Sequence, residues 1–388
     1  MVSVRRHAVH LFCVATLAGC GRSPTPFPGQ PTTVAAGVEF YASTDESLVD
    51  GAGPIAVALL KIDAAKAEIR SALSNGEVVN SETVDSIARR VGAIAAVNGG
   101  FFNRVNGEPT GLLKVSGELV SDARASKGAV IINRPPSGPP ELLFDLLAAK
   151  MTMVFSRDGR EWRIPIDGVD TTRQRGRLML YTPAYHADTD TAPTGTEWVL
   201  DGDPLRVVDV LSNYGHTRIP RKGAVLSFGG VSNVPEGLLQ LTEEVHVEFE
   251  TIWRSVHGVD SGRLDRAESI VSGAGLLRRA GVTATDWTAE GLSVEAFTAA
   301  RHPRTLIGVD TRGAVWLAAI DGRQADYSIG MTFADLQRLC DRLQLSDALN
   351  LDGGGSTTMV VGGKIVNRPS DPGGPRPVSD AIVVVSGR

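Results

Sequence analysis

Short apolar runs bounded by glycine and polar residues dominate the hydrophobic pattern of the chain from residue 270 onward. Runs of this length that are rich in Val, Ile and Leu predict β-strands. The expected strands cover residues 270–272, 305–310, 314–320, 348–351, 359–361, 364–366 and 381–385. Gly362 and Gly363 separate two of these strands with the spacing of a two-residue hairpin turn.

One segment of this region has a helical period instead. Residues 332–343 carry apolar side chains at three- and four-residue spacing, namely Phe333, Leu336, Leu339, Cys340 and Leu343. Thr332 and Asp335 have the spacing of a capping box, which satisfies backbone N–H groups at the start of a helix. We therefore predict a helix over residues 332–343, with Cys340 as a small core residue.

Nearer the N-terminus the pattern changes from strand to helix and back to strand. Residues 55–62 form a run rich in β-branched side chains and leucine, which predicts a strand. Apolar residues at helical spacing predict a helix over residues 81–91, and Gly92 ends it. Residues 93–97 then predict a buried strand, so Asn98 is expected at the tip of that strand.

The middle of the chain, residues 105–265, carries short β-like runs separated by proline and glycine. This pattern predicts a mostly antiparallel β region. Strands outnumber helices along the chain, so the predicted fold class is α+β, with a mixed, largely antiparallel sheet and flanking helices.

Composition is that of a globular protein and argues against one class of partner. The chain has 388 residues, 42% of them hydrophobic and 21% charged, and its formal net charge is −5. A protein that binds nucleic acid is expected to show a basic face. The clearest group of arginines, over residues 173–177, is diluted by neutral residues. We therefore expect no nucleic-acid partner.

The first twenty residues have the pattern of an export signal. Arg5 and Arg6 precede a mostly apolar stretch, which ends with small residues before a cysteine. Residues 1–19 resemble a bacterial lipoprotein signal peptide. That resemblance implies that Cys20 is acylated and anchors the protein by lipid to the membrane of the bacterial cell envelope, facing the periplasm or the exterior. An ordinary secretory signal or an uncleaved anchor is the alternative.

The segment after this signal has too few apolar residues to pack. Residues 20–37 are rich in Pro, Gly and Thr, which predicts a flexible tether. A globular domain is expected over residues 38–388.

One segment combines a carboxylate, glycines and hydroxyl groups. Asp352 follows a predicted buried strand and enters a run of three glycines. Glycine adopts backbone angles closed to other residues, and successive glycine N–H groups can line an anion. The segment predicts a site whose candidate residues are Asn350, Asp352, Gly353, Gly354, Gly355, Ser356 and Thr357.

The segment before the strand at 305–310 carries an imidazole and a guanidinium. Pro303 holds its neighbours extended, so His302, Arg304 and Thr305 lead into that strand. An imidazole can move a proton near neutral pH, and a guanidinium binds phosphate through two parallel hydrogen bonds. A lone histidine is nevertheless more often structural or exposed than catalytic.

A second pair of charges follows the strand at 314–320. Asp321 and Arg323 flank a glycine, so both side chains are expected to leave the sheet at its rim. Taken alone, this motif is usually an exposed turn pair of little energetic value.

The strand tip at Asn98 offers amide groups and aromatic rings. Amides hydrogen bond sugar hydroxyls and apolar sugar faces pack on rings, which makes Asn98, Gly99, Gly100 and Phe101 candidates for sugar binding. Phe101 and Phe102 alternate sides in a strand, so one of them is expected to face a ligand. The alternative is that both rings lie in the core and that Asn98 caps a turn.

Together these motifs resemble the phosphodiester glycosidase family. The resemblance is carried, in this order and spacing, by residues 98–103, 302–308, 321–323, 330–332, 350–356, Asn367 and Arg376. It is best over residues 90–133 and 270–385 and leaves 135–265 as a variable β-rich insertion. A Gly-x-Ser-x-Gly motif and the cysteine and histidine patterns of zinc sites are absent from the sequence.

The resemblance implies a hydrolase that cleaves a sugar-1-phosphodiester bond in a sugar phosphate or phosphoglycan of the envelope or exterior. Asp352 would activate water or stabilise the anomeric carbon, and Arg304 with the loop 353–357 would hold the phosphate. His302 and Asp321 would be the reserve acid and base. The implied substrate-binding residues are Asn98, Gly99, Gly100, Phe101, Thr305, Arg323, Asn350, Gly353, Gly354, Gly355, Ser356, Thr357 and Arg376.

Two alternatives to this reading stay open at the level of sequence. No cofactor is certain, and a Ca²⁺ or Mg²⁺ ion between Asp352 and the phosphate is compatible with a carboxylate loop. The rival function is that of a non-catalytic envelope lipoprotein that binds glycan or phosphoglycan.

Overall fold

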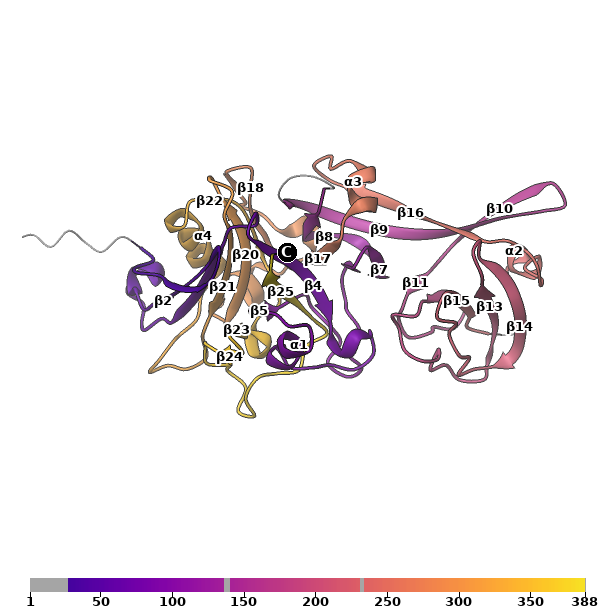
Figure 1. Cartoon of the computed structure of the whole chain (residues 1–388), viewed down its shortest axis with the longest axis horizontal. Helices are drawn as coiled ribbons and strands as arrows, with labels where there is room; N and C mark the ends of the chain where they lie inside the picture. The colour runs from indigo at the N-terminus through magenta and orange to yellow at the C-terminus, as the bar shows by residue number, and fades with distance from the viewer. Residues whose placement is uncertain (1–26, 136–139, 231–233, 388) are drawn as a thin grey trace, which may run out of the picture.

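Antiparallel β-sheets make up most of the fold in the computed structural model, which describes residues 27–135, 140–230 and 234–387 (Figure 1). Among the residues that the structure describes, strands account for 44% and helices for 12%. The α+β class predicted from the sequence is therefore right about antiparallel strands but overstates the helices. The strands also form four sheets instead of one mixed sheet. The predicted signal peptide and Cys20 lie outside the described residues.

The largest sheet has eight strands, and neighbouring strands in it are antiparallel. Their spatial order is β1 (Thr32–Ala35), β2 (Val38–Ser43), β3 (Val57–Ile62), β21 (Val315–Ile320), β20 (Arg304–Asp310), β22 (Leu345–Asn350), β18 (Leu276–Arg279) and β19 (Val282–Thr283). β1 lies inside the segment 20–37 predicted as a tether. The end of that segment therefore belongs to the sheet, because it pairs with β2.

A five-stranded sheet packs against one face of the eight-stranded sheet. Its spatial order is β24 (Lys364–Ile365), β23 (Met359–Val361), β5 (Ala95–Asn98), β25 (Asp380–Ser386) and β4 (Ala67–Leu73). Strand alternation explains the packing, since Ile307 of β20 faces the five-stranded sheet and Leu306 faces the opposite side.

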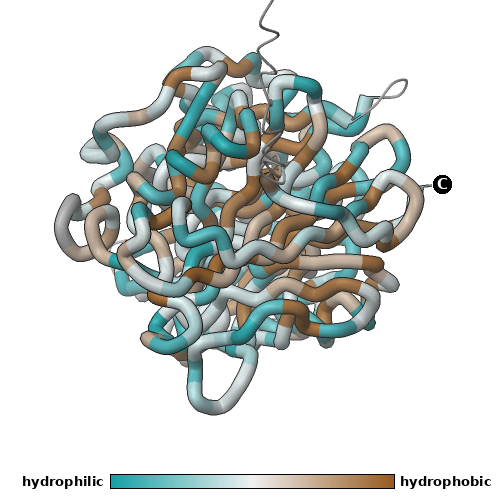
Figure 2. Tube along the Cα trace, turned by 90° about the vertical axis from the view of Figure 1, so that its left-hand side faces the viewer, coloured by the Kyte–Doolittle hydropathy of each residue, from teal (hydrophilic) through white to brown (hydrophobic). Residues whose placement is uncertain are grey.

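Two helices cover the outer faces of this pair of sheets (Figure 1). α4 (Phe333–Arg342) begins with the predicted capping box between Thr332 and Asp335, and Cys340 on its apolar side is fully buried against the eight-stranded sheet. α1 (Val84–Arg90) covers the five-stranded sheet. In Figure 2 the hydrophobic segments run mainly through the interior of these layers.

A seven-stranded sheet joins this body to the rest of the chain. Along its path lie β10 (Arg160–Pro165), β9 (Glu141–Arg157), β8 (Ala123–Asn133), β17 (Ser269–Ser272), β6 (Leu113–Val115) and β7 (Glu118–Ser121), with β16 (Glu248–Ser255) paired to β9. β9 has 17 residues and extends well beyond the body (Figure 1). α3 (Ser261–Arg266) packs on one face of this sheet.

The far end of β9 leads to a second lobe, residues 160–247, with a core of its own. Its five-stranded sheet has the order β11 (Gly168–Val169), β12 (Leu178–Tyr181), β15 (Ala224–Phe228), β13 (Gly195–Asp201) and β14 (Arg206–Tyr214). α2 (Glu236–Leu239) closes the apolar core around Trp198. The middle of the chain thus consists mainly of antiparallel strands, as its pattern predicts, apart from the parallel pair β11 and β12.

The other helical turns are short. They are the 3₁₀ turns η1 (Glu46–Val49), η2 (Ser74–Gly76), η3 (Thr288–Glu290) and η5 (Gly354–Ser356), and the π-helical turn η4 (Val294–Thr298). Among the described residues, no helix is both long enough and apolar enough to span a membrane.

Candidate active site

Three strand ends meet at the glycine run. β22 is antiparallel to β20, so the residues that follow β22 lie beside the start of β20. β5 reaches the same place from the five-stranded sheet, and its last residue, Asn98, contacts both segments. The structure therefore brings together the motifs at 98–103, 302–308 and 350–356.

The side chain of Asn98 joins these segments. Its Nδ2 donates to the carbonyl of Asp352 at 2.7 Å, and its Oδ1 accepts from Thr305 Oγ1 at 2.7 Å and from the N–H of Thr358 at 3.2 Å. Asn98 and Thr305 are both 0% exposed. The structure thus assigns both to positioning the loop rather than to contacting a ligand.

The backbone N–H groups of the glycine loop (residues 353–357) are largely used within the protein. The N–H of Gly353 donates to Asp352 Oδ1 at 2.8 Å, and that of Gly354 donates to the carbonyl of Pro303 at 2.9 Å. The N–H groups of the next two hydroxyl residues close the turn η5. The prediction that successive N–H groups of this loop line an anion is therefore corrected, because the loop is instead a rigid support for Asp352.

The carboxylate of Asp352 lies at the edge of this loop. It is partly exposed, and its oxygens accept hydrogen bonds from Ser356 and Gly353. Burial raises the pKa of Asp352 to about 6, while Ser356, Gly353 and the nearby Arg376 oppose the shift and Asp380 adds to it. A carboxyl group with this pKa titrates close to neutral pH, which suits a catalytic acid or base.

A second carboxylate, Asp380, was not identified from the sequence. It is 1% exposed and accepts hydrogen bonds from Ser379 Oγ at 2.7 Å and from the N–H of Gly100 at 3.2 Å. A Cβ atom at Gly99 would lie 1.8 Å from Asp380 Oδ2. Gly99 is therefore needed for the close approach to Asp380, whereas a Cβ atom at Gly100 would meet the carbonyl of Ser272 at 2.9 Å. Ser379 and Asp380 directly precede the apolar run of β25, and this pair of polar residues is the sequence signal that could have revealed Asp380.

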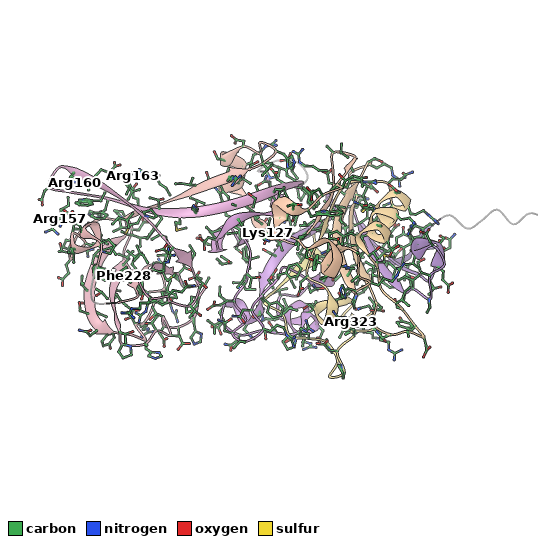
Figure 3. The ribbon with its side chains drawn as sticks, turned by 180° about the vertical axis from the view of Figure 1, so that it is seen from behind. Lys127, Arg157, Arg160, Arg163, Phe228 and Arg323 are labelled. Carbon is green, nitrogen blue, oxygen red and sulfur yellow. The ribbon has the colours of Figure 1, made fainter. Side chains whose placement is uncertain are left out.

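Arg323 lies against the glycine loop with its guanidinium unpaired. A Cβ atom at Gly354 would be 3.0 Å from Arg323 Nη2 and 3.1 Å from Nη1. The side chain is exposed and forms no hydrogen bond or ion pair with the residues that the structure describes. Its backbone has φ 60°, a left-handed conformation uncommon outside glycine. Figure 3 shows Arg323 at the edge of the main body.

Arg376 reaches the loop from another side, as predicted, but its charge is already balanced. Its Nε and Nη2 donate to Asp371 at 2.8 and 3.0 Å, and its Nη1 lies 3.4 Å from Ser356 Oγ. A Cβ atom at Gly355 would be 2.1 Å from Arg376 Nη2. Of the two arginines at this loop, Arg376 has an ion-pair partner and Arg323 has none among the described residues.

Arg304 does not reach the loop, which corrects its predicted phosphate-binding role. Its side chain is 2% exposed. Nε donates to the carbonyl of Met331 at 3.0 Å, and Nη2 donates to those of Phe297 and Ala300 at 2.6 and 3.1 Å. The rings of Phe297 and Phe333 lie 5.1 and 5.0 Å from the guanidinium carbon. Burial lowers the pKa of Arg304 to about 10. Arg304 is a structural cation under the helix layer.

Asp321 also points into the protein, which corrects its predicted role as a reserve acid or base. It is 3% exposed, and its carboxylate accepts from the N–H of Arg368 at 2.9 Å, from Asn367 Nδ2 at 2.9 Å and from Tyr327 Oη at 3.3 Å. Burial raises the pKa of Asp321. Asp321 ties a later loop to the strand end.

His302 lies beside the site, and one of its ring nitrogens is buried without a hydrogen-bond partner in the described part of the chain. Its Nε2 is 3.4 Å from the carbonyl oxygen of Ala296, and its buried Nδ1 has no hydrogen-bond partner among the described side chains. Burial lowers the pKa of His302, and the positive charges of Arg304 and Arg323 add to this effect. The imidazole is therefore neutral at pH 7.

The two phenylalanines after Asn98 leave the chain on different sides, as predicted. The ring of Phe101 lies 6.1 Å from that of Phe297, next to the segment that carries His302. Phe102 packs against the apolar cluster under α1. Phe101 is therefore the ring near the site.

The remaining predicted residues lie behind the loop. Asn350, Ser356 and Thr357 are each at most 1% exposed. Asn350 Nδ2 donates to the carbonyl of Ala274 at 2.8 Å. These side chains support the loop from within.

Side chains that converge closely enough to share a metal ion lie elsewhere. Within the described residues, the group of three or more carboxylate, imidazole or thiol ligands is Asp188, Asp190 and His216, whose ligand atoms lie within 4.8 Å of one another in the second lobe. Asp352 belongs to no such group among these residues, so the structure adds no support for a Ca²⁺ or Mg²⁺ ion there.

Residues 208–385 match the model of the phosphodiester glycosidase family. The resemblance seen in the motifs is confirmed. The match suggests phosphodiester glycosidase-like, hydrolytic activity. The range contains Asp352, Arg323 and Asp380 but begins after the segment 90–133, which was expected to match well, and it includes part of the insertion 135–265.

Curated relatives of this phosphodiester glycosidase-like chain are distant. An uncharacterised protein of Rickettsia conorii is 24% identical over 239 residues, which cover 61% of this chain and 77% of that protein. The N-acetylglucosamine-1-phosphodiester alpha-N-acetylglucosaminidase of Homo sapiens is 31% identical over 102 residues, 26% of this chain and 19% of that enzyme. The chain thus matches about one fifth of the human enzyme's length.

Two crystal structures share the fold. A hypothetical protein from Synechocystis superposes with a TM-score of 0.75 at 22% identity, over 92% of this chain and 64% of that chain. A protein from Burkholderia pseudomallei superposes with a TM-score of 0.71 at 25% identity, over 86% of this chain and 74% of that chain. The chain therefore spans less than two thirds of the Synechocystis protein.

Proposed function

We propose that this chain is a hydrolase that cleaves a sugar-1-phosphodiester bond and releases the sugar and a phosphomonoester. The observation that carries the proposal is that the unpaired guanidinium of Arg323 lies against the same loop that bears Asp352. This reaction develops positive charge on the sugar while the departing phosphate keeps its negative charge. A carboxylate and a free cation at the same loop fit both charges. The family match supports the same reaction.

In this proposal Asp352 acts on the sugar. Its carboxyl group is mostly ionised at pH 7, since its pKa is raised only to about 6. The carboxylate then either activates the attacking water or stabilises the positively charged anomeric carbon. The rigid loop 353–357 and Asn98 hold the Asp352 backbone in place, which limits the reorganisation that the reaction requires.

Arg323 replaces Arg304 as the residue that holds the phosphate. A guanidinium can donate two parallel hydrogen bonds to phosphate oxygens. Phosphate is already a good leaving group, so holding its charge matters more than protonating it. His302 is close enough to Arg323 to feel its charge, but its unpartnered Nδ1 is buried, so Asp352 is the group that we assign to proton transfer from water.

The sugar that we propose to test first is N-acetylglucosamine, which the name of the human relative specifies for that enzyme. The test is hydrolysis of UDP-N-acetylglucosamine and p-nitrophenyl α-N-acetylglucosaminide by the purified protein and by Asp352→Asn. The protein must retain β1, because this strand pairs with β2. We expect sugar release by the wild-type protein and a loss of about 100- to 10,000-fold in Asp352→Asn.

Asp326→Asn, at an exposed carboxylate, is the matched control and should keep full activity. A folded Asp352→Asn protein with full activity would remove Asp352 from the mechanism. No sugar release by the wild-type protein, from these or other sugar-1-phosphodiesters, would favour the non-catalytic glycan-binding lipoprotein.

We also propose that Cys20 carries a lipid that anchors the protein in the bacterial cell envelope. The basis is the signal-like pattern of residues 1–19. Labelling of cells with a fatty-acid analogue should mark the wild-type protein and not Cys20→Ala. An unlabelled wild-type protein in the soluble fraction would contradict this.

A further inference from the structure

Two adjoining cavities lie at the second lobe, and the smaller one is also lined by the hairpin of residues 101–110. One has a volume of about 880 Å³ and the other about 500 Å³. Thr172 and Gln174 line both, so the two cavities share a wall. Ligand sites in proteins commonly have volumes of about 300–1,000 Å³, so each cavity is large enough for a ligand. We refer to the pair as the lobe cavity.

The lining of the lobe cavity combines uncharged polar side chains with apolar surface and a few charged groups. Its hydroxyl and amide side chains include Asn103, Thr110, Ser121, Thr172, Gln174 and Thr194. Such groups both donate and accept hydrogen bonds, as the hydroxyl groups of a sugar do. Phe228 and Pro235 add a small apolar surface to the larger cavity, against which the C–H face of a sugar ring can pack.

The buried charged side chains of the wall have ion-pair or hydrogen-bond partners within the protein. Arg173 lies 3.4 Å from Glu197, and their side chains are 6% and 0% exposed. The carboxylate of Glu108 accepts hydrogen bonds from the hydroxyls of Thr171 and Thr172 at 3.0 and 2.7 Å. The wall therefore leaves no buried charge among these residues that requires an ionic ligand. Arg175 also lines the larger cavity, but it is exposed, so it can stay solvated when a neutral ligand binds.

The hairpin connects the lobe cavity to the candidate active site. The N–H of Thr110 donates to the carbonyl of Phe101 at 2.9 Å, and the N–H of Asn103 donates to that of Glu108 at 2.8 Å. Alternation along an extended chain places Phe101 and Asn103 on one side. Phe101 lies near the active-site segment, whereas Asn103 lines the cavity. Figure 3 shows Phe228, from the cavity wall, in the second lobe and Arg323 in the main body.

We propose that the lobe cavity is a binding subsite for a neutral oligosaccharide, which forms the part of the substrate beyond the phosphate. The identity of this ligand as substrate rests on the proposed function, but its binding does not require turnover. The wall residues 172–194 lie outside the range 208–385 that matches the family. The subsite is thus built in part by a segment outside the matched range.

The first experiment measures binding alone. Isothermal titration calorimetry would use neutral hexasaccharides of glucose, mannose and N-acetylglucosamine with the wild-type protein, Ala192→Trp, Gln174→Ala and Ala36→Trp. Ala192 is exposed and lines the larger cavity, so tryptophan there fills it, and Gln174→Ala removes an exposed amide. Ala36 is an exposed alanine in the turn between β1 and β2 and serves as the control.

We expect at least one hexasaccharide to bind the wild-type protein and Ala36→Trp equally and to bind Ala192→Trp at least about tenfold more weakly. Gln174→Ala should weaken binding in the same direction, which guards against a folding defect in Ala192→Trp. If none of the hexasaccharides binds, or if both cavity variants bind like the control, the proposal is wrong.

The second experiment separates this proposal from the proposed function. UDP-N-acetylglucosamine would be compared with an N-acetylglucosamine phosphodiester that carries the bound hexasaccharide beyond the phosphate. Ala192→Trp should raise KM for the long substrate about tenfold and leave the short substrate unchanged. An equal effect on both substrates would contradict the subsite. If neither substrate is hydrolysed while Ala192→Trp still loses hexasaccharide binding, the proposed function fails and the binding site stands.

Discussion

The rim around Asp352 and the second lobe are held together in different ways. At the rim, buried polar side chains bond segments that are far apart in the sequence, as Asn98 does to Asp352 and Thr305. The second lobe has its own apolar core around Trp198, and its buried ion pair joins residues of the same lobe. The rim therefore depends on individual hydrogen bonds, whereas the lobe depends on apolar packing, part of which it shares with the main body through Met179, Tyr181 and Val225.

Among the variants that test this contrast, Arg323→Ala is expected to cause the largest loss of activity. Arg323 is exposed and unpaired among the described residues, so removing it should leave the melting temperature unchanged. Because it would hold the phosphate, kcat/KM should fall about 100- to 1,000-fold. Steady-state kinetics with UDP-N-acetylglucosamine and a thermal melt check this. Normal activity in Arg323→Ala would move the phosphate away from this loop.

Arg304→Ala should behave in the opposite way. The substitution removes the side-chain donor to the carbonyl groups of Phe297, Ala300 and Met331 and opens a gap between two rings. The free energy of unfolding, measured by urea denaturation, should fall by about 3 kcal/mol. A stable Arg304→Ala protein that has lost only activity would restore the phosphate-binding role expected from the sequence.

Gly99→Ala tests the close approach of the chain to Asp380. A Cβ atom there would lie 1.8 Å from the carboxylate, so the free energy of unfolding should fall by about 1–3 kcal/mol. Gly373→Ala is the matched control, because no atom lies within 4 Å of a Cβ at that position. Equal stability of the two variants would show that Asp380 moves aside freely.

The pH dependence of Asp352 separates activity from stability. Burial raises its pKa from 3.8 to about 6, so the folded state holds the proton more tightly than the unfolded state, and the stability that this provides is lost as the pH rises from about 4 to about 6. Between pH 4 and 7, the free energy of unfolding of Asp352→Asn, measured in urea, should therefore rise relative to that of the wild-type protein. Over the same range wild-type kcat/KM should rise. A stability difference that does not change with pH would contradict the raised pKa.

Individual elements were more accessible from the sequence than the contrast between the two regions. The capping box of α4 and the strand after it follow from local patterns, whereas the motifs at 98–103, 302–308 and 350–356 were grouped through the family resemblance. The direction in which individual side chains point could not be predicted from the sequence. Arg304 and Asp321 look like site residues by type, but their donors and acceptors are satisfied by carbonyl and N–H groups of segments that no local pattern connects to them.

The lobe cavity was less accessible still, because a cavity depends on how two separately formed walls approach each other. Thr172 and Asn103 have no sequence pattern that links them, and both lie before the residues that match the family. Hydroxyl and amide residues in turns are common, so their convergence is visible only in three dimensions.

The smallest effect is expected from Thr305→Val, which keeps the shape of the side chain and removes one hydroxyl. Thr305 Oγ1 donates to Asn98 Oδ1 at 2.7 Å, and Asn98 in turn holds Asp352. The loss of one buried hydrogen bond should lower the free energy of unfolding by about 1–2 kcal/mol. Since Asn98 keeps its bond to the Asp352 carbonyl, kcat should fall only severalfold with KM unchanged. Thr196→Val, a similarly buried threonine in the second lobe, should leave kcat unaltered because it lies far from this chain of contacts. If the two valine variants have the same kcat, the hydrogen bonds at the rim do not position Asp352, and the distinction between the two regions is one of stability alone.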